Sequence, residues 1–166
     1  MKIEFQEIGF IHSPHKELSG MPIQPSGAKG IKGFVEIYED FSEGIKDLEG
    51  FSHIILLYYF HKSNGFKLTV TPFLDKTPRG LFATRAPKRP NSIGLSIVKL
   101  IDIKKNIIHI EDVDILDETP LIDIKPYVPE FDYRSNTTIG WLESYKKNSI
   151  LKKSDNRFIE FNKNQK

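Results

Sequence analysis

Arginine side chains gather in one short part of this lysine-rich chain. The sequence contains 24 Lys and Arg residues, but only five are arginines, and Arg79, Arg85 and Arg89 lie within eleven positions. The planar guanidinium binds carboxylate or phosphate through two parallel hydrogen bonds, whereas lysine provides one flexible charge. The stretch RAPKRPNSIGLS, residues 85–96, therefore predicts an anion or cofactor site.

An ordinary surface loop is the alternative interpretation of the same stretch. Pro90 and Asn91 are typical turn residues, and Gly94 permits close backbone approach. A surface loop explains the prolines, but it does not explain two arginines four positions apart beside a glycine. We therefore favour the anion site.

Asp123 is the acidic residue whose surroundings most strongly suggest chemistry. It lies in PLIDIKPY, where the neighbouring Leu and Ile residues indicate burial. A buried carboxylate needs a positively charged partner or hydrogen-bond donors, and Arg85 or Arg89 could serve. A structural ion pair and a ligand-binding or catalytic role both remain open.

Metal chemistry has little support in the residue types. The five histidines do not follow a zinc-binding spacing, and the chain has no cysteine. Asp112 and Asp114 share one strand face. A magnesium site requires carboxylates that converge from several elements, so we interpret this face as solvated. We expect no metal. His61 ends the most apolar strand. Its side chain could either form a hydrogen bond at the strand end or contact a ligand, and both roles remain open.

Composition limits the class of protein. The 166 residues carry a net charge of +2, so no strong attraction of the whole molecule to nucleic acid is implied. The N-terminus lacks the apolar core of a signal peptide, and the longest apolar run, HIILLYYF, has eight residues against the roughly 20 of a membrane helix. We expect a soluble, cytoplasmic protein without disulfides.

Strand-forming residues and proline-rich loops dominate the predicted elements. Ser42 is the expected N-cap of a short helix over 42–50, and the prolines at 120, 126 and 129 argue against a helix after residue 119. A long Gly- and Pro-rich loop covers 12–33, and its glycines lack the context of a dinucleotide fingerprint. Strands are predicted over 3–11, 33–38, 53–60, 67–71 and 80–84, followed by a hairpin with arms 96–103 and 107–115. The predicted fold is all-β and mainly antiparallel, closed into a barrel or sandwich.

The C-terminal segment is basic. Residues 146–166 contain seven Lys or Arg and two acidic residues, whereas the rest of the chain is slightly acidic. We favour a solvated tail over an RNA-binding arm. The stretch NRFIEF, residues 156–161, is a candidate for one more short strand.

Four motifs in order carry a resemblance to a known family. They are GFIHSP, LEGFSHIILLYYFH, FATRAPKRPNSIGLS and DETPLIDIKPYVP, within about residues 5–142. The chain resembles the TsaA-like family of S-adenosylmethionine-dependent tRNA methyltransferases, which methylate N6 of threonylcarbamoyladenosine next to the anticodon. The resemblance implies a single-sheet β-barrel methyltransferase domain over 1–142, a basic extension over 143–166, and a homodimer with the cofactor near the subunit interface.

The resemblance also implies positions for the cofactor and the active-site loop. The usual R-Q-P-G of the family reads IQPSG here, so the arginine is absent. The implied cofactor contacts are Gln24, Pro25, Ser26, His61, Lys62, Arg85, Leu95, Leu121, Ile122, Asp123 and Ile124, and the implied active-site loop is Arg89, Pro90 and Asn91.

A direct methyl transfer needs a group that accepts the proton of the substrate nitrogen. Asp123 or Tyr127 is the expected acceptor, and Arg85 is expected to bind either the cofactor carboxylate or a tRNA phosphate. A base of the anticodon loop is expected to stack on Phe60, Phe66 or Tyr127. Two alternatives stay open: a non-catalytic barrel that binds RNA or a nucleotide-like ligand, and a methyltransferase with a different acceptor.

Overall fold

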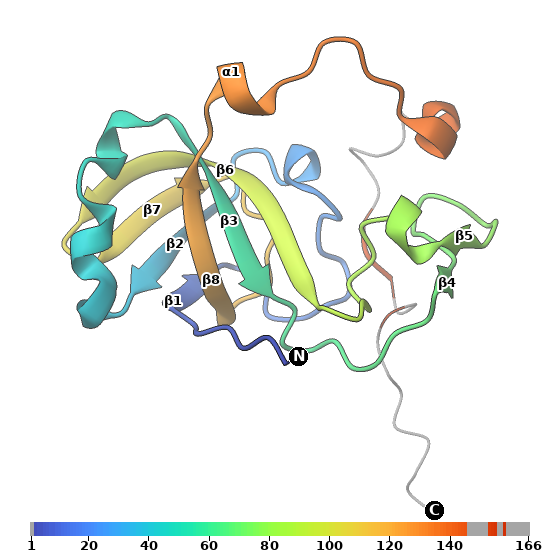
Figure 1. Cartoon of the computed structure of the whole chain (residues 1–166), viewed down its shortest axis with the longest axis horizontal. Helices are drawn as coiled ribbons and strands as arrows, with labels where there is room; N and C mark the ends of the chain where they lie inside the picture. The colour runs from blue at the N-terminus through green and yellow to red at the C-terminus, as the bar shows by residue number, and fades with distance from the viewer. Residues whose placement is uncertain (1, 146–152, 156–157, 159–166) are drawn as a thin grey trace, which may run out of the picture.

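Six antiparallel strands close into a barrel, as Figure 1 shows. The computed structural model describes residues 2–145, 153–155 and 158. In spatial order the barrel strands are β1 (Gly9–His12), β2 (Lys32–Ile37), β7 (Ile107–Glu111), β6 (Ile93–Lys104), β3 (His53–Tyr59) and β8 (Thr119–Pro126), and β8 pairs with β1. The predicted antiparallel barrel is confirmed. A separate two-stranded sheet joins β4 (Thr69–Val70) and β5 (Arg79–Gly80).

Strict alternation along the strands fills the barrel interior. In β6, buried and exposed residues alternate over several positions from Gly94, because successive side chains point to opposite faces. The inward residues are mostly branched and apolar, which suits the centre of a small barrel. The fully buried ones include Ile11, Val35, Ile54, Leu56, Val98, Ile108 and Leu121.

The predicted hairpin is present as β6 and β7. β6 begins at Ile93, before the expected position, and the turn is formed by Lys105 and Asn106. Lys105 has φ of 55°, and the Asn106 side chain donates a 2.8 Å hydrogen bond to the carbonyl of Ile37. The turn therefore also fastens the hairpin to β2.

The predicted helix over 42–50 is wrong in type and in start. Two 3₁₀ helices occupy the region, η2 (Glu39–Ile45) and η3 (Leu48–Gly50). Ser42 lies inside η2, where its hydroxyl donates to the carbonyl of Glu39 instead of capping. Asp47, with φ of 65°, separates the two turns.

Other boundaries also differ from the predictions. The strand expected over 3–11 is reduced to β1, and the region 80–84 forms the 3₁₀ helix η4 (Leu81–Ala83). A helix does occur after residue 119: α1 (Pro129–Asp132) begins at Pro129, a first-turn position where proline loses no hydrogen bond. Two further 3₁₀ helices are η1 (Pro25–Gly27) and η5 (Gly140–Tyr145). Within the described residues, no helix has the length and apolar character needed to cross a membrane.

Candidate functional site

One end of the barrel opens into a cavity of about 880 Å³. Its walls come from the end of β3, the start of β6, the segment between β7 and β8, the loop over 18–24, and η4 with the residues after it. In an antiparallel barrel the end of one strand lies beside the start of its neighbour, so these segments meet at the same edge. A cavity of this size holds a cofactor-sized molecule.

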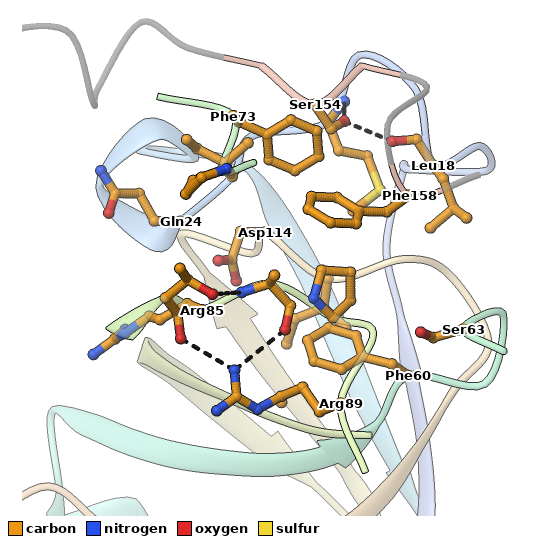
Figure 2. A pocket seen from close by; sticks show the side chains of 18 of the residues that line it. Leu18, Gln24, Phe60, Ser63, Phe73, Arg85, Arg89, Asp114, Ser154 and Phe158 are labelled. Atoms are coloured by element: carbon orange, nitrogen blue, oxygen red, sulfur yellow. Dashed lines mark hydrogen bonds between the residues drawn. The ribbon is translucent and has the colours of Figure 1, made fainter. Parts of the chain in front are cut away.

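A carboxylate lines this cavity, that of Asp114, which is labelled in Figure 2. The hydroxyl of Ser96 donates a 2.7 Å hydrogen bond to Asp114 Oδ1. The hydroxyl of Tyr58 lies 3.1 Å from Ser96 Oγ, and because Ser96 spends its only proton on Asp114, Tyr58 is the donor. The two hydroxyls thus form a chain of donors that ends on the carboxylate.

Burial changes the acidity of both ends of this chain. Desolvation raises the pKa of Asp114 to about 6, and the hydrogen bond from Ser96 and the charge of Arg85 only partly oppose it. Desolvation, followed by the charge of Asp114, also raises the pKa of the Tyr58 phenol, which therefore stays protonated. The protonation of Asp114 therefore changes close to neutral pH.

The backbone at Gly94 lets Tyr58 take its place. Gly94 pairs with Tyr58 across β3 and β6, and a Cβ atom at Gly94 would overlap the Tyr58 ring. Only glycine therefore allows the ring to cross the neighbouring strand. The sequence suggested a close backbone approach at Gly94, whereas in the structure the Tyr58 side chain makes the close approach.

The arginine-rich loop borders the cavity in two different ways. Arg85 is exposed, lines the cavity and acts electrostatically on Asp114 and Tyr58. Arg89 also lines the cavity, but its Nη1 donates to the carbonyls of Thr84 at 3.1 Å and of Ala86 at 3.4 Å. Both arginines therefore border the cavity, and Arg89 also holds the loop through its Nη1.

Several expected site residues meet at this cavity. Gln24, His61, Lys62, Arg85, Arg89 and Leu95 all line it. Pro25 begins η1 directly after Gln24, and Ser26, Pro90 and Asn91 are not among the lining residues. Burial lowers the pKa of the His61 imidazole, so this side chain is neutral at pH 7. The positive charge expected at this site therefore comes from the arginines and Lys62, and not from His61.

Asp123 lies elsewhere, and its predicted burial and pairing with Arg85 or Arg89 are wrong. Its side chain is 42% exposed, forms a 2.7 Å ion pair with Lys125, and lines a second cavity of about 560 Å³ with Ile124, η2 and η3. A bulge explains the difference. Leu57 pairs with Asp123 but the next residue, Tyr58, pairs with Leu121, so the alternation along β8 reverses and Asp123 shares the outer face with Leu57.

The other residues of the PLIDIKPY motif also lie outside the main cavity. Leu121 is fully buried in the barrel core, and Ile122 occupies the bulge beside it. Tyr127 donates its backbone N–H to the carbonyl of His53, and the two rings lie 6.4 Å apart. The residues of this region that do line the main cavity are earlier: Asp114, Ile115, Leu116 and Thr119.

The described part of the C-terminal segment packs against the rim of the main cavity. The hydroxyl of Ser154 donates to the carbonyl of Leu18 at 2.6 Å and accepts from the N–H of Met21 at 2.9 Å. Phe158 packs edge-on against Phe73, with 5.0 Å between ring centroids, and both rings lie above Asp114 in Figure 2. The prediction of a solvated tail is therefore wrong for Ser154 and Phe158. The predicted strand over 156–161 falls mostly outside the described residues.

The residue most clearly missed from the sequence is Asp114, which we interpreted as part of a solvated face. The order of the strands contained the missing signal. β6 starts at the cavity, so its hairpin partner β7 must end there, and Asp114 follows that end. Among the residues that the structure describes, no group of three or more His, Asp or Glu side chains could hold a metal ion.

Comparison with known proteins identifies the family. A family model described as the tRNA-methyltransferase O N-terminal domain matches residues 10–133. The chain belongs to this family. The resemblance inferred from the four sequence motifs is therefore confirmed.

Relatives of the tRNA-methyltransferase O family differ in length. A probable S-adenosyl-L-methionine-binding protein of Pyrococcus abyssi is 54% identical over 164 residues, which are 99% of this chain and 89% of the relative. The tRNA (adenine(37)-N6)-methyltransferase of Escherichia coli strain K12 is 36% identical over 151 residues, covering 85% of this chain and 64% of the relative. The crystal structure of TrmO from Pseudomonas aeruginosa matches with a TM-score of 0.72 and 35% identity, covering 85% of this chain and 63% of that chain.

These matches bear on the predicted fold and on the predicted cofactor, and they also compare the lengths of the chains. The chain spans less than two thirds of the Escherichia coli and Pseudomonas aeruginosa proteins. The barrel predicted from the sequence agrees with the solved fold, and S-adenosylmethionine, the expected cofactor, is the molecule in the name of the Pyrococcus abyssi relative.

Proposed function

We propose that this protein is an S-adenosylmethionine-dependent methyltransferase that acts on N6 of adenine 37 in tRNA, with threonylcarbamoyladenosine as the acceptor. Family membership and the names of the relatives support the reaction class. The single observation that carries a catalytic role is the carboxylate of Asp114, held by a hydroxyl chain inside a cofactor-sized cavity. A tRNA acceptor implies action in the cytoplasm.

The side chains of the main cavity fit the chemical groups of the cofactor. S-adenosylmethionine has a carboxylate, a positively charged sulfonium and an adenine ring. Arg85 suits the carboxylate, Asp114 suits a nearby positive charge, and the aromatic wall with Phe60 and Phe73 suits a flat ring. We propose that Gln24, His61, Lys62 and Leu95, which line the same space, complete the contacts. When bound, the cofactor supplies an electrophilic methyl group.

Asp114 has the properties of a proton acceptor. A carboxyl group whose pKa is about 6 is mostly ionised at pH 7, yet it is a stronger base than an ordinary aspartate. The hydrogen bond from Ser96 fixes one carboxylate oxygen and leaves the other for a substrate N–H. We propose Asp114, in place of Asp123 or Tyr127, as the group that takes the proton from the acceptor nitrogen.

We also infer a homodimer through the outer face of β3 and β6. Exposed and partly exposed apolar residues line up there, because Leu57 pairs with Leu95 and Ile55 pairs with Ile97. A contiguous apolar strip of this kind is uncommon on a monomer surface. Leu95 also lines the cavity, so a second copy seated on this face would border the cofactor site. Ile97→Lys should shift the protein from dimer to monomer in size-exclusion chromatography with light scattering.

Two measurements on the full chain test the proposed function. Calorimetric titration with S-adenosylmethionine should show binding that Arg85→Ala abolishes. Transfer of a labelled methyl group should then occur to tRNA that carries threonylcarbamoyladenosine. Cofactor binding without transfer to any RNA favours the non-catalytic barrel, and transfer to a small molecule alone favours a different acceptor.

A further inference from the structure

Phe82 is a large apolar side chain that the fold leaves in solvent at the mouth of the main cavity. Its exposed fraction is 74%, although its neighbour Leu81 is almost completely buried. Successive residues of a 3₁₀ helix are rotated by about 120° around its axis, so Phe82 can lie on the exposed side of η4 while Leu81 is buried. An exposed aromatic ring beside a cofactor-sized cavity is a candidate contact for a ligand.

The backbone that carries Phe82 is fixed on both sides. Leu81 donates its N–H to the carbonyl of Leu68 at 2.8 Å, and Thr84 donates both its N–H, at 3.0 Å, and its hydroxyl, at 2.7 Å, to the carbonyl of Leu81. The indole N–H of Trp141 donates to the carbonyl of Ala83 at 2.8 Å. The ring is therefore presented by a rigid turn, which reduces the entropy lost when a partner stacks on it.

A guanidinium group lies against this ring. The Cζ atom of Arg89 is 5.7 Å from the centroid of the Phe82 ring, a distance typical of a cation–π contact. The hydrogen bonds that Arg89 donates to Thr84 and Ala86 both use Nη1. Within the described part of the chain, Nε and Nη2 of Arg89 therefore have donors to offer to an anion.

We propose that Phe82 and Arg89 form a stacking platform for an unpaired base of the RNA acceptor, with the guanidinium facing an adjacent phosphate. This inference rests on the proposed function. A flat open ring recognises any base by stacking, and a cation beside it suits the charged backbone of a single strand. The platform lies at the mouth of the cavity that contains Asp114, so it would hold the RNA where a base can enter.

The aromatic residues favoured from the sequence fit this role less well. Phe60 is partly buried and packs edge-on against Tyr58, with 5.4 Å between ring centroids. Phe66 is exposed but does not line the cavity, and Tyr127 packs against His53. Compared with Phe60, Phe66 and Tyr127, Phe82 alone combines high exposure with a place on the cavity wall.

Three substitutions at one position test the platform in the full-length protein. Binding of a fluorescein-labelled anticodon stem-loop RNA is measured by anisotropy, and binding of S-adenosylmethionine is measured by calorimetry. Phe82→Ala and Phe82→Leu should weaken RNA binding by about 5- to 150-fold, the loss expected for one base–aromatic stack. Phe82→Trp should retain it, because the aromatic face remains. Phe131→Ala is the matched control, since Phe131 is 71% exposed on α1 and does not line the cavity.

Each alternative result would exclude the stacking platform and would indicate a different role for Phe82 or for the protein. Equal RNA affinity for wild type, Phe82→Ala and Phe82→Leu would exclude stacking while leaving the proposed function intact. A parallel loss of S-adenosylmethionine affinity would make Phe82 part of the cofactor site, and a changed oligomeric state would make it a subunit contact. A wild-type protein that binds S-adenosylmethionine but no tRNA would overturn the proposed function together with the platform.

Discussion

Asp114 lines one cavity and Asp123 lines the other, and both lie beside apolar residues in the sequence, but these two aspartates differ in their access to water. Asp114 is desolvated, hydrogen-bonded through Ser96 to Tyr58, and has a pKa of about 6. Asp123 lies on the outer face, is ion-paired with Lys125, and is 42% exposed. Apolar neighbours in the sequence therefore do not make a carboxylate reactive. The strand face and the register decide whether water reaches it.

The strongest test of this comparison is to neutralise each aspartate in turn. Asp114→Asn should lower kcat by about 10²- to 10⁴-fold, the usual contribution of a general base. Asp123→Asn removes only an exposed ion pair and should leave kcat nearly unchanged. Steady-state methyl transfer to tRNA measures kcat of both variants. A larger loss in Asp123→Asn than in Asp114→Asn would reverse the assignment.

Replacing one glycine in each cavity by alanine compares the packing around the two cavities. Gly94→Ala should destabilise the protein by about 1–3 kcal/mol, since the added methyl group overlaps the Tyr58 ring. In a domain of this size that lowers Tm by roughly 2–4 °C per kcal/mol. Gly44→Ala, at the second cavity, places its Cβ in open space and should not lower Tm. Thermal unfolding followed by circular dichroism measures both, and an equal loss in the two variants would show that the fit at Gly94 is not special.

The pH dependence of methyl transfer reports the state of Asp114. If Asp114 is the proton acceptor that we propose, transfer needs its ionised carboxylate, so the rate should rise with pH through about 6 and then level off. Below that value it should fall by about tenfold for each pH unit, because only the ionised fraction is active. Asp123→Asn should keep this profile, whereas the residual activity of Asp114→Asn should lose it. A wild-type rate that stays constant from about pH 5 to about pH 8 would contradict the role of Asp114.

The smallest expected effects concern the contacts at the rims of the cavities. Ser154→Ala removes the part-buried acceptor of the Met21 N–H, which should cost about 0.5–1.5 kcal/mol of local stability. Lys125→Ala breaks the ion pair with Asp123 and should cost about 0–1 kcal/mol. Hydrogen exchange at Gly20 and Met21 should become faster only in Ser154→Ala. Unchanged exchange there would mean that the C-terminal segment does not close this rim.

Local patterns in the sequence were sufficient for the barrel and for the family. The β-branched arms around Lys105 and Asn106 predicted the β6–β7 hairpin, and the arginine-rich stretch, predicted as an anion or cofactor site, does line the main cavity. The order of four short motifs was enough to identify the family. These features can be predicted because alternation, turn residues and charge clusters depend on near neighbours.

Whether Asp114 or Asp123 is the desolvated aspartate depended on the tertiary structure. An extra residue in β8 turns Asp123 outward, and closure of the barrel brings Ser96 and Tyr58 to Asp114. The contact of Ser154 with Leu18 likewise joins segments 136 positions apart. The sequence by itself determined which residues form most of the strands and which family they belong to. Only the folded barrel decided which side chains lose water and meet, because strand register and closure join residues that no local pattern connects.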